Sequence, residues 1–229
     1  MSIVEKGNTR ESRENHLRCS LRPRPCHPAR SSGTSRRPRR RRPGNLDRNC
    51  TIASVGTDNH GNLVALTAGH CMRVPHQRVS VGGRQVGTFA AWSSTWPSKP
   101  FREDAQLDYA VIKLDPKVVT PTNLTPEGHR VDRITPYPDP RQLLCKYGQV
   151  TEHTCGKVLE RDRNAVRSWQ LVFPGDSGGP AYVGSALVGI ASSINLLRVW
   201  APVQFTGIGG VLADLAAQGG VGAGFTPIR

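Results

Sequence analysis

Three side chains in this sequence belong to types that cooperate in nucleophilic catalysis: a histidine at His70, a carboxylate at Asp108 and a hydroxyl at Ser177. A serine hydroxyl is a weak nucleophile and needs a base within hydrogen-bonding distance. Histidine titrates near neutrality, so His70 can accept the hydroxyl proton and later return it to a leaving amine. A carboxylate bonded to the other ring nitrogen fixes the tautomer and stabilises the imidazolium. These three residues are therefore the candidate catalytic group.

The local sequence around each residue supports this interpretation. The histidine ends an apolar run, the aspartate opens another, and the serine lies in a glycine-rich turn; the segments are Thr67–Cys71, Leu107–Ile112 and Gly175–Pro180. Glycines permit positive φ angles and let a substrate backbone approach closely. Taken singly, each segment has a structural alternative: a histidine after a strand, an aspartate that caps a strand, or a β-turn. Their joint occurrence favours catalysis, and we expect no metal and no cofactor.

The order His, Asp, Ser and the three motifs resemble those of the chymotrypsin-like serine peptidases, from about Cys50 to the end of the chain. The resemblance implies a serine endopeptidase that hydrolyses peptide bonds through an acyl-enzyme. It also implies that the backbone N–H groups of Gly175 and Ser177 form an oxyanion hole. Removing one such donor typically costs about a hundred- to a thousandfold in rate. The expected partner is a polypeptide substrate, and the expected state is a monomer.

The cysteines resemble those of the bacterial streptogrisin and α-lytic branch of that family. The resemblance pairs Cys50 with Cys71, which closes the loop that carries the histidine, and Cys145 with Cys155, which closes a hairpin. Two such bridges, each worth about 2–4 kcal/mol, imply an oxidising compartment and hence an extracellular or secreted protein. The alternative is four free thiols in a cytosolic protein, and no apolar segment near Met1 marks a secretory signal.

An acidic residue, Asp176, directly precedes the candidate nucleophile. In the bacterial branch, an arginine directly after the first cysteine of the hairpin disulfide pairs with that acid. The matching position here is Lys146. Lysine supplies the charge but not the planar, two-pronged geometry of arginine. The alternative is an exposed lysine on the hairpin and an aspartate bonded only to backbone groups.

The same resemblance assigns Leu171, Ser192 and Ile194 to the substrate pocket. The stretch Ser168–Phe173 contains no acidic residue, so a preference for Lys or Arg is not expected. Ser192 matches the serine that buttresses the catalytic acid. Ile194 stands where a glycine is usual, which narrows or blocks the pocket and favours small apolar side chains. A third disulfide near the pocket, common in relatives, has no cysteines here.

The composition and apolar pattern predict an all-β fold. The chain of 229 residues is rich in glycine (24) and proline (18), and about six short apolar runs lie on each side of a proline-rich connector. This pattern predicts two antiparallel six-stranded Greek-key barrels, at about 46–115 and 142–229, joined by a connector at about 116–141. A C-terminal helix is expected, with Val211 and Leu215 on its apolar face and Gly219 as its stop. No apolar run is long enough for a membrane span.

Residues 1–45 form a separate basic segment. They hold 13 Lys and Arg against 3 Asp and Glu, whereas the rest of the chain holds 18 against 14. Such a composition cannot bury enough apolar surface to offset its ordering entropy, so it predicts a disordered tail before a peptidase domain at 46–229. The tail is interpreted either as a polyanion-binding arm or as an extension without a role, and no specific nucleic-acid partner is expected.

Three functions therefore remain open at the level of sequence. The first is a secreted serine endopeptidase. The second is a catalytically weak or inactive homologue that acts as a binding protein, with its pocket closed by Ile194. The third is polyanion binding through the arginine-rich tail. The complete set of His70, Asp108 and Ser177 favours the first.

Overall fold

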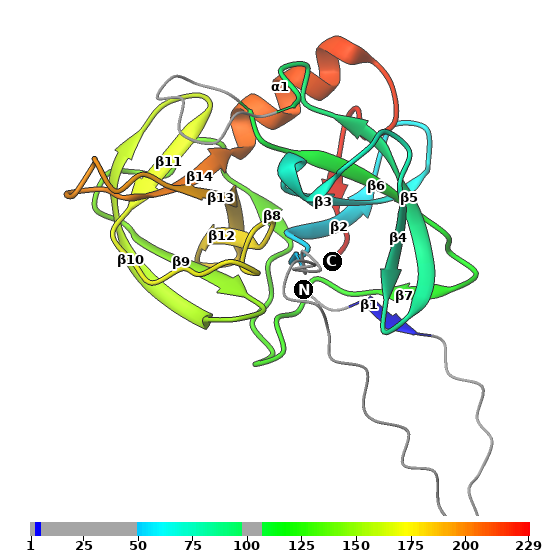
Figure 1. Ribbon diagram of the computed structural model, residues 1–229, viewed down its shortest axis with the longest axis horizontal. Helices are drawn as coiled ribbons and strands as arrows, with labels where there is room; N and C mark the ends of the chain where they lie inside the picture. The colour runs from blue at the N-terminus through cyan, green and yellow to red at the C-terminus, as the bar shows by residue number, and fades with distance from the viewer. Residues whose placement is uncertain (1–2, 6–49, 98–106) are drawn as a thin grey trace, which may run out of the picture. The chain divides into compact units, whose positions relative to one another are not determined.

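The computed structural model describes residues 3–5, 50–97 and 107–229, and β-strands dominate it (Figure 1). The strands form two larger sheets, one built mainly from residues 54–114 and the other from residues 133–207, and this confirms the predicted mostly β fold. Most of the basic segment 1–45, and with it the predicted disorder, lies outside the described residues. Its one described element is the short strand β1 (Ile3–Glu5), which pairs antiparallel with β7 (Val119–Pro121).

The first sheet contains six antiparallel strands. In spatial order they are β15 (Thr226–Pro227), β2 (Ser54–Thr57), β3 (Leu63–Thr67), β6 (Ala110–Leu114), β5 (Arg84–Trp92) and β4 (Arg78–Val81). Apolar side chains from these strands are fully buried in one core, among them Val55, Val64, Leu66 and Val111. The last strand differs from the predicted domain ranges. Residues of β15 fall within the range expected for the second barrel, yet they pair with Gly56 and Thr57 of β2.

The second sheet contains seven strands. In spatial order they are β12 (Pro180–Val183), β9 (Leu143–Gly148), β10 (Glu152–Arg161), β11 (Ala165–Ser168), β14 (Val203–Gly207), β13 (Ala186–Ile194) and β8 (Arg133–Ile134). A further pairing between β12 and β13 closes the first six into a barrel. The barrel surrounds a buried cluster that includes Leu144, Val166, Val188 and Phe205. The connector contributes β8, which pairs in parallel with β13.

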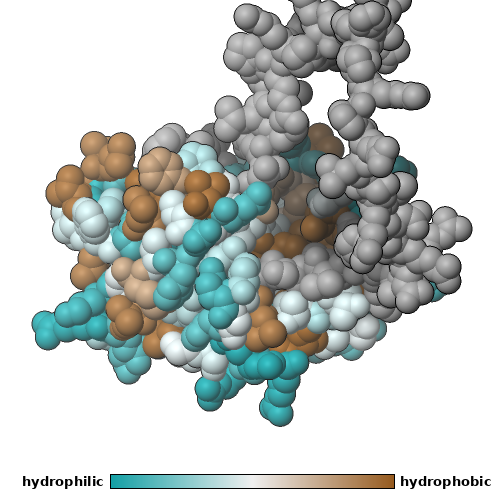
Figure 2. Space-filling model, turned by 90° about the horizontal axis from the view of Figure 1, so that it is seen from below, coloured by the Kyte–Doolittle hydropathy of each residue, from teal (hydrophilic) through white to brown (hydrophobic). Residues whose placement is uncertain are grey.

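The C-terminal helix α1 spans Ile208–Gln218, as the sequence predicts (Figure 1). It buries Ile208, Val211 and Leu215, and it ends at Gly219, whose φ of 68° is left-handed and suits glycine. Within the described ranges, no helix has the length and apolar character needed to cross a bilayer. The surface in Figure 2 mixes apolar (brown) and polar (teal) side chains.

The structure contains both disulfides that the resemblance implies. Cys50 is bonded to Cys71, and Cys145 is bonded to Cys155. The first bridge ties the start of the described body to the short 3₁₀ turn Gly69–Cys71 after β3. The second joins directly paired residues of the hairpin β9–β10. Both bridges therefore brace segments that lead into the candidate site.

Peptide mapping under non-reducing conditions should recover Cys50 linked to Cys71 and Cys145 linked to Cys155. Converting Cys145 and Cys155 together to serine should lower the free energy of unfolding by about 2–4 kcal/mol, which urea denaturation can measure. Converting Cys19 and Cys26 together to serine is the matched control and should leave the stability unchanged. A peptide that links Cys50 to Cys145 would contradict the two-sheet arrangement.

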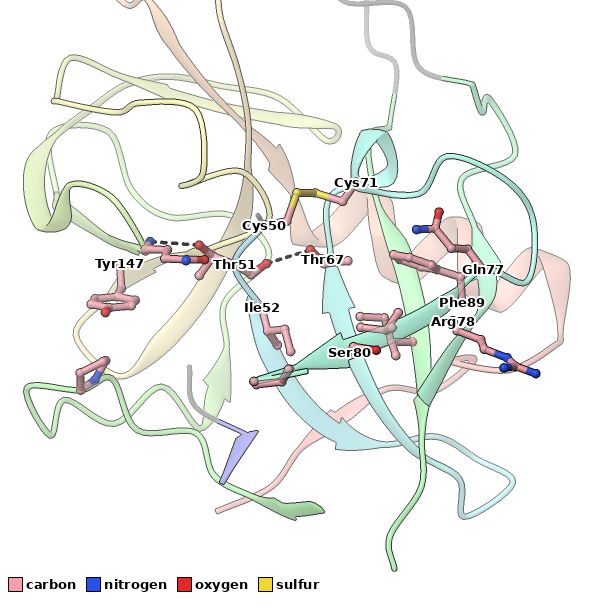
Figure 3. Close-up of a pocket in the computed structure, with 16 residues that line it drawn as sticks. Cys50, Thr51, Ile52, Thr67, Cys71, Gln77, Arg78, Ser80, Phe89 and Tyr147 are labelled. Carbon is pink, nitrogen blue, oxygen red and sulfur yellow. Dashed lines mark hydrogen bonds between the residues drawn. A yellow bond between two sulfur atoms is a disulfide. The ribbon is translucent and has the colours of Figure 1, made fainter. Parts of the chain in front are cut away.

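A cavity of about 650 Å³ lies between β4 and the segment 50–52 (Figure 3). Phe89 and Ile112 are among its apolar lining residues. Among the described strands, none pairs with the outer edge of β4. Thr51 forms part of the wall and reaches from there to the turn that carries Ser177.

Candidate active site

The candidate base stands where β3 leaves the first sheet. His70 occupies the middle of the 3₁₀ turn that follows β3, and its side chain is 28% exposed. The residue before it must be glycine, because a Cβ on Gly69 would lie 2.9 Å from the Tyr109 carbonyl oxygen and 3.0 Å from Asp108 Oδ1. This close approach places the turn that carries His70 in contact with Asp108 and Tyr109.

The candidate acid holds the histidine at two points. Asp108 Oδ2 lies 2.6 Å from His70 Nδ1, and Asp108 Oδ1 accepts the His70 backbone N–H at 2.8 Å. The Ser192 hydroxyl donates to Oδ2 at 2.8 Å. Because an ionised carboxylate only accepts, Nδ1 carries the ring proton and Nε2 is left with its lone pair. This is the tautomer that a general base requires.

Asp108 is buried, with 5% of its surface exposed, yet its surroundings keep it ionised. Burial by itself raises the pKa of a carboxyl group. Hydrogen bonds from His70 and Ser192, together with attraction to the His70 ring when that ring is protonated, outweigh that effect and hold the pKa of Asp108 below its ordinary value. The carboxylate is therefore available to stabilise a protonated imidazole.

The candidate nucleophile lies on the turn between Phe173 and β12. The Thr51 N–H donates to the Ser177 carbonyl at 2.8 Å, and the Gly178 N–H donates to the Ala191 carbonyl at 2.7 Å. Gly178 has a φ of 85°, and a Cβ there would lie 3.0 Å from the Ala68 nitrogen. Only glycine fits so close to the end of β3. The turn is thus packed against the strand that presents His70.

Two backbone N–H groups on this turn belong to Gly175 and Ser177, the residues assigned to an oxyanion hole by resemblance. Among the described residues, neither the Gly175 N–H nor the Ser177 N–H has a protein acceptor. Gly175 has a φ of 112°, a conformation that only glycine adopts readily. The intervening Asp176 N–H is instead bonded to the Phe173 carbonyl at 3.0 Å. The Asp176 N–H is therefore occupied within the turn.

The acid beside the nucleophile is paired with Lys146. Lys146 Nζ lies 3.2 Å from Asp176 Oδ2, and the two side chains are 0% and 1% exposed. Nζ also donates to the Glu152 carbonyl at 3.0 Å and to the Thr151 hydroxyl. The three protons of the ammonium group therefore have three acceptors, which meets the condition for burying such a charge.

Asp176 receives four donors besides the lysine. Oδ1 accepts the backbone N–H groups of Val150 (2.9 Å) and Thr151 (3.0 Å), and Oδ2 accepts the Phe173 N–H (2.9 Å) and the Thr151 hydroxyl (2.5 Å). Burial opposes ionisation, but these bonds hold the pKa of Asp176 below its ordinary value. Burial lowers the pKa of Lys146, and the Asp176 carboxylate opposes that shift. The hairpin turn and the nucleophile turn thus share one buried ionic centre.

The pocket residues separate into two groups. Ser192 is bonded to Asp108 and so supports the candidate acid. Leu171 is 56% exposed, and Ile194 lies at the end of β13, where it pairs with Val203 of β14. The apolar side chains of the following loop are also exposed, at Leu196, Leu197, Val199 and Trp200.

Sequence reasoning missed the group that holds this loop. Glu160 of β10 accepts from Arg198 Nη1 at 3.0 Å and from the Trp200 indole N–H at 2.6 Å. The contacts span 38 and 40 residues along the chain, so no local motif indicates them. Glu160 therefore fastens the loop beside Ile194 without a disulfide.

Within the described residues, every cysteine is in a disulfide and offers no thiolate to a metal. Two groups of neighbouring ligand types occur in the described part of the chain, Cys50, His70 and Cys71, and Cys145, His153 and Cys155. All four of those cysteines are in disulfides.

Comparisons with known proteins concern the family and the fold of the chain. A family model described as Trypsin matches residues 44–199, which is more than half of the chain. No curated protein matches the chain.

Solved structures share the fold. One is the chymotrypsin of Cellulomonas bogoriensis, at 22% identity and a TM-score of 0.56, covering 79% of this chain and 91% of that one. Another is protease A of Thermobifida fusca, at 22% identity and a TM-score of 0.58, covering 78% and 92%. The inactivated protease paralogue S-D1 of the scabies mite is also similar, at 16% identity and a TM-score of 0.50, covering 78% and 89%.

Proposed function

Because the chain belongs to the trypsin family of serine peptidases, we propose that it hydrolyses internal peptide bonds through an acyl-enzyme, with His70, Asp108 and Ser177 as its catalytic residues. The observation that carries the proposal is the pair of hydrogen bonds between Asp108 and His70, at 2.6 Å and 2.8 Å. The Ser192 hydroxyl donates a third hydrogen bond to Asp108. This arrangement fixes the ring and leaves Nε2 as a proton acceptor.

In the first half of the reaction, Ser177 Oγ attacks the carbonyl carbon while His70 Nε2 takes the hydroxyl proton. The carbonyl oxygen becomes an oxyanion and accepts the N–H groups of Gly175 and Ser177. The C–N bond then breaks, and the leaving amine takes the proton from His70. The product is an ester between Ser177 and the acyl half of the substrate.

In the second half, water takes the place of the amine. His70 accepts a proton from the water as its oxygen attacks the ester carbonyl, and the same two N–H groups receive the oxyanion. The ester C–O bond breaks, the proton returns to Ser177 Oγ, and the carboxylic acid leaves. Asp108 stabilises the imidazolium in both halves without taking the proton itself.

The test is hydrolysis of casein by the full, oxidised chain, with and without prior treatment with a phosphonate serine reagent. The proposal predicts cleavage that the reagent abolishes. Cleavage that resists the reagent, or a folded protein that does not cleave casein, would reject it.

The proposed substrate is a polypeptide with a small apolar side chain before the scissile bond. Ile194 carries this proposal, because its branched side chain stands at the end of β13 beside Ser192. The two disulfides and the bacterial relatives support an extracellular location. We propose that the protein acts as a monomer.

Replacing Ile194 with glycine should shift the preference from alanine or valine toward phenylalanine. A hydrophobic pocket distinguishes one or two methylene groups by about tenfold or more in kcat/KM, so the ratio of the two rates should change by at least about tenfold. Peptide substrates that differ only at this residue provide the measurement. Val199→Gly, in the exposed loop, is the matched control. Faster cleavage by the wild-type protein after arginine than after alanine would contradict the proposed pocket.

A second candidate function is that of an inactive family member that binds polypeptides without cleaving them. The similarity to the scabies mite protein supports this candidate, because that protein has the same fold and is described as an inactivated protease paralogue. The casein assay separates the two functions, since an inactive homologue shows neither cleavage nor loss of cleavage with the reagent.

A further inference from the structure

Thr51 contacts three separate parts of the molecule at once. Its backbone N–H donates to the Ser177 carbonyl at 2.8 Å, and its carbonyl accepts the Thr67 hydroxyl at 2.8 Å. Its own hydroxyl donates to the Gly175 carbonyl at 2.9 Å and accepts the Gln149 N–H at 3.1 Å. Figure 3 shows the residue in this position, with the dashed bonds on either side of it.

The direction of these bonds is determined by the partners. A backbone N–H can only donate, so Gln149 occupies a lone pair of the Thr51 hydroxyl. The hydroxyl proton is then directed to the Gly175 carbonyl, which can only accept. Among the described residues, no other donor reaches that carbonyl. Thr51 is 6% exposed, so water is a poor substitute for it.

The bonded carbonyls belong to the two residues whose N–H groups are the proposed oxyanion donors. Thr51 bonds to Gly175 through its hydroxyl and to Ser177 through its backbone. Gly175 has a φ of 112° and no side chain, so its own sterics restrict the peptide on either side very little. A hydrogen bond from Thr51 to the Gly175 carbonyl is therefore a direct way to fix the orientation of the loop's peptide groups.

The same hydroxyl reaches the hairpin turn. Gln149, which donates to it, precedes Val150 and Thr151, whose N–H groups bind Asp176. The nucleophile turn is thus held to one hairpin turn from two sides, by Asp176 and by Thr51. We propose that Thr51 is a positioning residue for the oxyanion loop and acts through its hydroxyl. The proposal rests on the proposed peptidase function.

Thr51→Val removes the hydroxyl and keeps the branched shape. It should lower kcat by about tenfold, which corresponds to about 1.4 kcal/mol of activation free energy. KM should change by less than about twofold, because the oxyanion donors bind charge that develops in the transition state and not in the bound substrate. Thr51→Ser restores the hydroxyl without the methyl group and should keep kcat within about twofold of the wild type.

A second pair of variants provides the same comparison if Thr51→Val does not fold. Thr51→Ala and Thr51→Ser also differ by one hydroxyl, so their ratio of kcat should repeat the effect if valine is not accommodated. Thr125→Val is the matched control, since Thr125 is 3% exposed and its hydroxyl accepts the His129 N–H far from the site along the chain. It should change thermal stability only. The rate of phosphonate labelling at Ser177 should fall in parallel with kcat.

The outcomes are distinguishable. If the wild-type protein does not hydrolyse casein, the proposed function fails, and the role of Thr51, which rests on it, fails with it. If the wild-type protein is active and Thr51→Val keeps its kcat, only the role of Thr51 is rejected. Equal loss of kcat in Thr51→Ser and Thr51→Val would also reject it, because the variant that keeps the hydroxyl would then be no more active than the variant that lacks it.

Discussion

Ser177→Ala should lower the rate of peptide hydrolysis by about four to six orders of magnitude, because it removes the atom that bonds to the substrate. His70→Ala should cost a similar factor, since Ser177 then has no base. Asp108→Asn keeps the shape of the side chain but forces the wrong tautomer on His70, and we expect it to lower the rate by about four orders of magnitude. The double variant of Ser177 and His70 should be no slower than the slower single one, because the residues act as a unit.

Initial rates on one chromogenic peptide, measured with each variant at equal concentration, provide the comparison. Ser80→Ala, on β4, is the control for loss of an exposed serine hydroxyl and should match the wild type. Circular dichroism of each variant checks that the fold is retained. A Ser177→Ala protein with more than a few per cent of the wild-type rate would contradict the assignment of the nucleophile.

Asp176→Asn should produce the second large effect, a loss of about 3–5 kcal/mol in the free energy of unfolding. The substitution leaves the buried ammonium of Lys146 without its counter-charge. It also places an amide NH₂ where an oxygen accepts donors from Phe173, Thr151 and Lys146. The Gly175–Ser177 loop should lose its order, and kcat should fall more than KM rises. Lys146→Met should cost less, because Asp176 keeps four other donors.

Urea denaturation measures both effects, and Asp132→Asn is the matched control. Asp132 forms an ion pair with Arg130 at 3.9 Å, and the Arg130 side chain is 51% exposed. Such a pair is worth about 0–1 kcal/mol. If Asp176→Asn costs no more than Asp132→Asn, the buried pair does not support the active turn.

The same carboxylate predicts a dependence of stability on pH. The pKa of Asp176 is lowered in the folded state, so its contribution is complete above its unfolded value of about 4. It is lost as the pH falls through the lower, folded value. The wild-type protein should therefore lose stability on acidification below about pH 4, and Asp176→Asn should lose less over the same range. An equal loss in both proteins would show that other carboxyl groups, such as Asp108, account for the acid sensitivity.

Motifs that are local in sequence were the predictable part of the site. His70 follows β3 and Asp108 precedes β6, and the apolar pattern of each strand is visible in the sequence. The pairing of the two strands, which brings the residues together, is a result of the structure. Lys146 and Asp176 were matched by position next to a cysteine and next to a serine. In each case, a short stretch of sequence is enough to indicate the candidate residue.

The remaining contacts depend on residues that no pattern marks. Thr51 meets Gly175 across 124 positions, and Asp176 meets Thr151 across 25. A threonine has the same appearance in a sequence whether its hydroxyl faces water or a buried carbonyl. The strand β15 has two residues, which is too short for any alternation to indicate which sheet it joins. Such features follow only from packing of the whole chain.

The most direct test of the account is the reaction of the full, oxidised protein with a fluorophosphonate, followed by intact mass measurement and peptide mapping. Such a reagent reacts rapidly with a serine only when a base removes its proton and nearby donors stabilise the oxyanion. The account predicts one adduct for each molecule, located on Ser177 and absent from His70→Ala. A folded protein with both disulfides intact and no adduct on Ser177 would contradict the proposed catalysis and identify the chain as an inactive member of its family.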